Sequence, residues 1–156
     1  MTVSPVPEGL PTLIPHLGVK GAAEAIDFYA RAFGAREILA RIADGQGRVG
    51  HAELQIGRSV FYLADEHPEI DKFGPPSLGG SPVSFLLHVD DVDTLVQQAV
   101  SAGAELTQPV ADQFYGDRTG QVKDPYGYSW TLSTHVEDVS EEEMQRRAAE
   151  LYGKQD

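Results

Sequence analysis

The 156-residue sequence contains no cysteine. This absence excludes disulfide bonds, a thiolate nucleophile and a zinc site built from cysteine ligands. No apolar run is long enough to cross a bilayer. The N-terminus also lacks the basic segment and apolar core of a secretion signal. We therefore expect a cytoplasmic protein without a membrane partner.

Positive charge is scarce, because 12 lysines and arginines face 24 acidic residues and the formal net charge is −12. Such a chain repels phosphate backbones, which argues against a nucleic-acid partner. An acidic surface serves solubility, and it can also attract a cationic small molecule.

The first half of the chain shows one strand, one helix and three further strands. Residues 12–19 read as a strand, and residues 21–35 have apolar side chains three and four positions apart, which is typical of an amphipathic helix. Gly34 is placed to end this helix in a left-handed cap. Strands are then predicted at residues 36–42, 48–56 and 58–64, with glycines in the turns.

The second half repeats this order. A strand is predicted at residues 81–89, a helix at 90–103, and strands at 104–110, 118–123 and 128–134. Val19 and Val89 are 70 residues apart, as are Gly57 and Gly127, and a fixed period indicates duplicated units. We therefore expect each of these pairs to superpose. A last helix opens with Ser140 and Glu143 in the spacing of a capping box.

These patterns predict an α+β fold in a single domain over residues 1–156. Two βαβββ units would form a curved mixed sheet around a cleft, followed by a C-terminal helix. The expected bounds are residues 12–65 for unit one, 66–80 for a linker, 81–135 for unit two and 140–152 for the helix. Exposed sheet edges and the apolar positions of the last helix predict a homodimer.

Four stretches of the sequence carry a family resemblance: "FYARAFGA", "HAELQIG", "YGDRTGQVKDPYGYSW" and "STHVEDVS". They resemble the vicinal oxygen chelate superfamily, and more narrowly the PhnB-like branch of the glyoxalase/bleomycin-resistance/dioxygenase proteins. The resemblance runs from about Thr12 to Arg147. It implies the fold above and a dimer, but no single activity, because this scaffold serves isomerases, dioxygenases, thiol transferases and drug-binding proteins.

The resemblance also implies where a metal ion would bind. Metal-dependent members place histidine or glutamate five residues before the valine that ends each first strand, and four residues after the glycine of each last hairpin. This sequence has Ile14, Ser84, Phe61 and Thr131 there. None is a good ligand for a divalent ion, so we expect no metal and no cofactor. This argues against glyoxalase I activity, ring-cleaving dioxygenase activity and fosfomycin-type thiol transfer.

Strand alternation predicts which side chains line the cleft. The candidate ligand-binding residues are His16, His51, Glu53, Phe61 and His88, with Tyr115 at the cleft mouth. Tyr62 and Trp130 are instead expected in the core. His51 and Glu53 are neighbours on one face and are the candidate catalytic residues. They could form a general base with its orienting carboxylate, part of a displaced metal site, or the polar lining of a wet cleft.

The leading interpretation is a metal-free binder of a small organic molecule, with no assigned reaction, whose ligand lies between Phe61, Tyr115 and the histidines. Two alternatives stay open. One is a lyase, isomerase or dioxygenase-type enzyme that uses a non-standard metal or the His51 and Glu53 pair. The other is an acidic protein that sequesters a drug.

Overall fold

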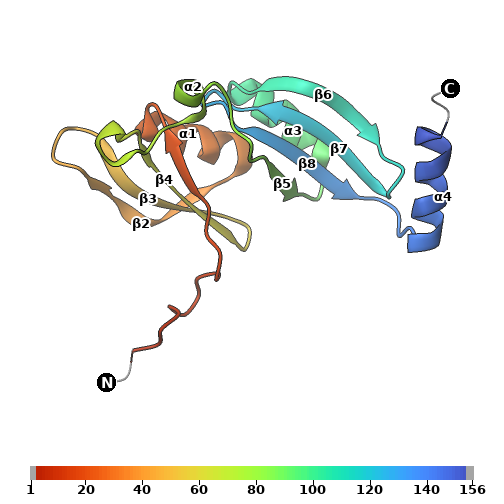
Figure 1. Cartoon of the computed structure of the whole chain (residues 1–156), viewed down its shortest axis with the longest axis horizontal. Coiled ribbons are helices and arrows are strands. Elements are labelled where there is room, and N and C mark those ends of the chain that lie inside the picture. Colours follow the sequence, from red (N-terminus) through yellow and green to blue (C-terminus); the bar gives the residue numbers. More distant parts are fainter. Residues whose placement is uncertain (1–2, 154–156) are drawn as a thin grey trace. The chain divides into compact units, whose positions relative to one another are not determined.

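The computed structural model describes residues 3–153, and the chain divides into two compact units between residues 81 and 82. Each unit contains a strand, a helix and three further strands, and a C-terminal helix follows the second (Figure 1). The expected α+β fold of two βαβββ units is confirmed. Within residues 3–153, no helix is long and apolar enough to cross a membrane.

The first unit is a four-stranded mixed sheet with one long helix. Its elements are β1 (His16–Val19), α1 (Ala22–Phe33), β2 (Arg36–Ala43), β3 (Val49–Ile56) and β4 (Ser59–Asp65). The strand order is β1-β4-β3-β2, with β1 parallel to β4 and the other pairs antiparallel. Helix α1 packs against β3 and β4. We call the opposite side of β1, β4 and β3 the open face.

The second unit has the same topology. Its elements are β5 (Phe85–His88), α3 (Val92–Ala102), β6 (Glu105–Asp112), β7 (Asp117–Lys123) and β8 (Ser129–His135), in the strand order β5-β8-β7-β6. Helix α4 (Glu141–Tyr152) begins at Ser140, whose hydroxyl accepts a hydrogen bond from the Glu143 N–H at 3.2 Å. The expected cap is therefore confirmed. The segment after β4 contains the short helices η1 (Pro68–Ile70) and α2 (Pro75–Leu78).

The start of each long helix is fixed by a side chain from the end of its unit's last strand. The Asp65 carboxylate accepts hydrogen bonds from the Gly21 and Ala22 N–H groups at 3.1 and 2.8 Å. In the second unit the Thr134 hydroxyl accepts from the Val92 N–H at 2.9 Å. Both contacts satisfy amide groups that a helix leaves without an internal partner. Asp65 and Thr134 are thus matching positions, although they lie 69 residues apart.

The 70-residue period therefore does not hold along the whole repeat. His16 pairs with Tyr62, and the corresponding pair in the second unit is Leu86 with Thr131. The hairpin between β7 and β8 contains one residue more than the hairpin between β3 and β4, as the registers show. Tyr62 consequently matches Thr131. The expected match of Gly57 with Gly127 is wrong, whereas Val19 with Val89 agrees with the pairing.

This shift corrects the predicted orientation of Phe61. Its side chain is 6% exposed, and its ring lies edge-on to Tyr29 of α1 with 5.5 Å between centroids. Phe61 therefore belongs to the core on the helix side of the sheet, and not to the open face. Tyr62, expected in the core, takes the place on the open face. Trp130 is 4% exposed and is in the core as predicted.

Candidate functional site

Four side chains from three adjacent strands meet on the open face of the first unit. They are His16 from β1, His51 and Glu53 from β3, and Tyr62 from β4, and we call them the histidine–tyrosine cluster. Strand register brings them together, because Tyr62 pairs with His16 on one side and with Glu53 on the other. The Tyr62 ring lies edge-on to both imidazoles, with 4.9 Å between centroids in each case.

A hydrogen bond orders the cluster around the Glu53 carboxylate. His51 Nε2 lies 3.0 Å from Glu53 Oε1. The Glu53 side chain is only 17% exposed and that of His51 31%. If Nε2 carries the proton and donates it to Glu53, Nδ1 of His51 is left to accept a hydrogen bond or a proton. The carboxylate therefore orients the imidazole and selects its tautomer.

Tyr62 and His16 are both held in their neutral forms. Burial raises the pKa of Tyr62, and the negative charge of Glu53 and a hydrogen bond to it act in the same direction. Burial also lowers the pKa of His16, with further contributions from the positive charges of Lys72 and His51. At neutral pH the cluster thus offers a phenol, a neutral imidazole and an oriented His51–Glu53 pair.

The donor set does not favour a metal ion. No group of three or more His, Cys, Asp or Glu side chains in residues 3–153 is arranged to hold one. At the position matching Thr131 the chain has Tyr62 instead of Phe61, and a phenol whose pKa is raised is a poor ligand. The cluster is suited to hydrogen bonding, ring stacking and proton transfer.

The other candidate residues lie in the second unit. His88 is exposed at the end of β5, and Tyr115 packs edge-on against Phe114 with 5.2 Å between ring centroids. Their roles in ligand binding stay predictions. Arg48 pairs with Asp44 at 2.6 Å and Arg118 with Asp93 at 2.8 Å, so these two arginines have structural partners.

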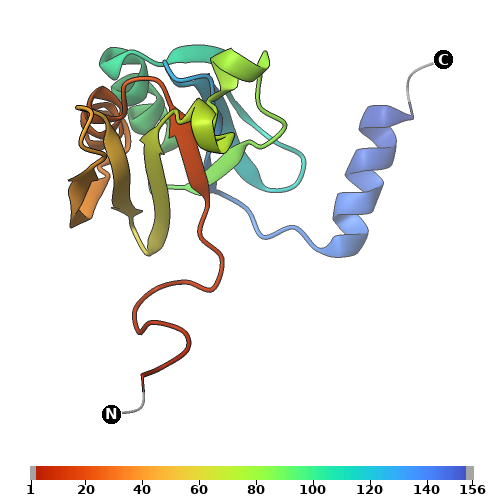
Figure 2. The same cartoon turned by 60° about the vertical axis from the view of Figure 1, so that its left-hand side comes forward.

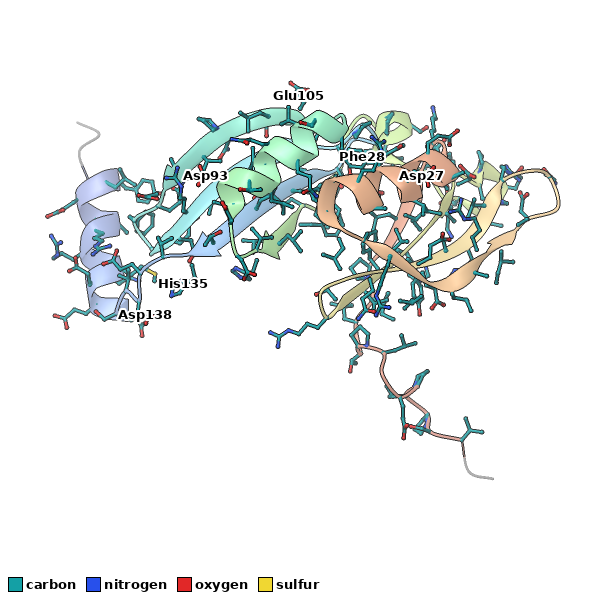
Figure 3. All side chains as sticks on the ribbon, turned by 180° about the vertical axis from the view of Figure 1, so that it is seen from behind. Asp27, Phe28, Asp93, Glu105, His135 and Asp138 are labelled. Carbon is teal, nitrogen blue, oxygen red and sulfur yellow. The ribbon has the colours of Figure 1, made fainter. Side chains whose placement is uncertain are left out.

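His135 is held between two carboxylates at the end of β8. Its Nδ1 lies 2.8 Å from Asp117 and its Nε2 2.8 Å from Asp138, which Figure 3 shows beside it. Hydrogen bonds to Asp138 and Asp117 raise the pKa of His135 above 6.5. The bridge therefore stabilises the fold fully below pH 6.5, and this contribution is lost as the pH rises through the raised pKa.

We expect an NMR titration to place the pKa of His135 above 6.5 in the folded protein. Asp138→Asn should lower it, because the first-named partner loses its charge. Asp112→Asn, which changes an acidic residue that pairs with Arg118, should leave it unchanged. A pKa of His135 at or below 6.5 in the wild type would contradict the bridge.

Comparison with known proteins identifies the family. Residues 13–132 match the model of the Glyoxalase/Bleomycin resistance protein/Dioxygenase superfamily, and the chain belongs to this family. An uncharacterised protein of Mycobacterium bovis is 44% identical over 138 residues, which cover 86% of this chain and 90% of the relative. An uncharacterised Arabidopsis thaliana protein is 28% identical over 125 residues, covering 76% of this chain and 75% of the relative.

Solved structures agree with this assignment. The structure of a gene product from Arabidopsis thaliana is 30% identical with a TM-score of 0.65, and covers 80% of this chain and 98% of its own. TioX from Micromonospora sp. ML1 is 26% identical with a TM-score of 0.63, over 81% and 99% of the two chains. A PhnB protein from Bacillus cereus, at 20% identity and a TM-score of 0.59 over 80% and 99% of the two chains, shares the fold.

Proposed function

We propose that this protein binds a small, planar organic molecule at the histidine–tyrosine cluster, without the help of a metal ion. The observation that carries the proposal is the convergence of four mutually oriented polar and aromatic side chains on a sheet face away from α1. A structural role alone would not require two partly exposed imidazoles beside a largely buried carboxylate. Tyr62 supplies a ring for stacking, and His51 supplies a directed hydrogen-bond acceptor.

A second candidate is acid–base catalysis, which the 3.0 Å contact between His51 and Glu53 favours. Proton abstraction needs a base whose orientation is fixed by a third group, and the carboxylate does this for His51. Binding and catalysis differ in one observable. A catalyst exchanges an acidic C–H proton of a bound carbonyl compound with solvent, whereas a binder does not.

Ligand binding is tested by NMR with benzamide as the probe. We expect benzamide to shift the ring resonances of His51 and Tyr62. The substitution His51→Ala should weaken binding about tenfold, because it removes one hydrogen-bond partner and its packing. His67→Ala is the matched control in the same unit, because His67 pairs with Asp44 and Glu69 outside the cluster. Shifts confined to residues away from the cluster would contradict the proposal.

Catalysis is tested with acetophenone in D2O. The leading function predicts no loss of its methyl proton signal beyond that in buffer. Loss that depends on protein, and that Glu53→Gln abolishes, would instead support the acid–base enzyme.

A further inference from the structure

The segment that follows β4 passes across the open face beside the histidine–tyrosine cluster. We call residues 66–74 the strap, and Figure 2 shows this yellow-green segment next to β1. Gly18 and Gly74 approach so closely that a Cβ atom on Gly74 would lie 2.8 Å from the Gly18 carbonyl oxygen, and one on Gly18 would collide with the Phe73 carbonyl. Gly18 and His16 are two residues apart on one strand and share a face. The strap therefore crosses β1 about 7 Å from His16.

The backbone of Lys72 in the strap is fixed. Its N–H and carbonyl exchange hydrogen bonds with the His67 carbonyl and N–H, at 3.0 and 2.8 Å. Next to it, the Glu66 carboxylate accepts a hydrogen bond from the Gly74 N–H at 2.7 Å. Lys72 thus presents its charge from a rigid segment, at a fixed place beside the cluster.

The positive charge of Lys72 is not used by an ion pair. No carboxylate in residues 3–153 lies within 4 Å of its ammonium group, although the chain has an excess of acidic residues. The nearby carboxylates have other partners, since Glu66 binds the strap backbone and Glu69 pairs with Arg48 and His67. On the cluster side, Glu53 is engaged by His51.

We infer that the ligand carries an acidic group, and that Lys72 is the counter-charge that selects it. This inference rests on the proposed function, because it names the class of molecule that the cluster takes: a planar organic carboxylate. The ring would lie against Tyr62 and the imidazoles, and the carboxylate would face the ammonium group. A neutral His16 between them can donate a hydrogen bond to the same carboxylate.

The first test measures whether the charge of Lys72 reaches the cluster. The pKa of His16 should rise in Lys72→Met, because the substitution removes a positive charge that lowers it. Lys123→Met, which removes an exposed lysine at the end of β7 in the second unit, is the matched control and should leave the pKa of His16 unchanged. An unchanged pKa of His16 in Lys72→Met would overturn the inference.

The second test compares benzoate with benzamide, two probes of the same shape that differ in charge. We expect benzoate to bind wild type about tenfold more tightly than benzamide, and Lys72→Met to abolish this difference without weakening benzamide. Lys72→Arg should retain it. Equal affinity for the two probes in the wild type would overturn the anionic ligand while leaving the proposed function intact. If neither probe binds, the proposed function fails for this class and the inference fails with it.

Discussion

Replacing Phe61 with alanine should lower the free energy of unfolding by about 3–5 kcal/mol, whereas replacing its neighbour Tyr62 with phenylalanine should cost less than about 1 kcal/mol. Phe61 is buried against Tyr29 of α1 and pairs across the sheet with Leu54, which is fully buried. Its removal opens a cavity in the core. The change at Tyr62 removes only a hydroxyl group and keeps the ring on the open face.

The same pair of variants separates stability from binding. Phe61→Leu, a milder core change, should still bind benzamide as the wild type does, because Phe61 does not reach the open face. Tyr62→Ala should lose binding, since the ring that contacts both imidazoles disappears. Urea denaturation and NMR titration measure the two properties. A stable Phe61→Ala variant together with an unstable Tyr62→Phe variant would show that the two side chains have the opposite orientations.

The order of strands and helices follows from the sequence, because short-range signals determine it. Periodicity located α1, and Gly34 ends that helix with a φ of 69°, as a left-handed glycine cap requires. Ser140 and Glu143 fixed the start of α4. Each signal acts within a few residues, so each can be read without knowledge of distant contacts.

The face of β4 could not be obtained in the same way, because it depends on the length of a hairpin. A match at 70 residues set Phe61 beside Thr131, and a difference of one residue between the two hairpins reverses inside and outside along the whole strand. The available signal was the sequence of the turns, since Gly57-Arg58 suits a two-residue loop and Asp124-Pro125-Tyr126-Gly127 a longer one. The charge of Lys72 beside the cluster was also inaccessible, because the strap is positioned by the close approach of Gly18 and Gly74.

The longer hairpin is also the basis of the second large effect. Asp124 is 4% exposed, and its carboxylate accepts three hydrogen bonds: from the N–H of Tyr126 at 2.9 Å, from the N–H of Tyr128 at 3.0 Å and from Nε1 of Trp130 at 2.9 Å. This one side chain closes the turn and also satisfies the buried indole. It explains why so tight a turn precedes a strand whose large side chains face the core.

Asp124→Ala should therefore destabilise the protein by about 3–5 kcal/mol, because it leaves several buried donors without an acceptor. Asp124→Asn should cost less, since the amide retains one acceptor oxygen of similar shape. Trp130→Phe in the Asp124→Ala background should recover part of the loss, because it removes one of the unsatisfied donors, and a double-mutant cycle measures this coupling. Thermal and urea denaturation of the four proteins provide the cycle. Additive effects of the two substitutions would show that the contact between the indole and the carboxylate contributes nothing to stability, and that the loss in Asp124→Ala comes from the turn alone.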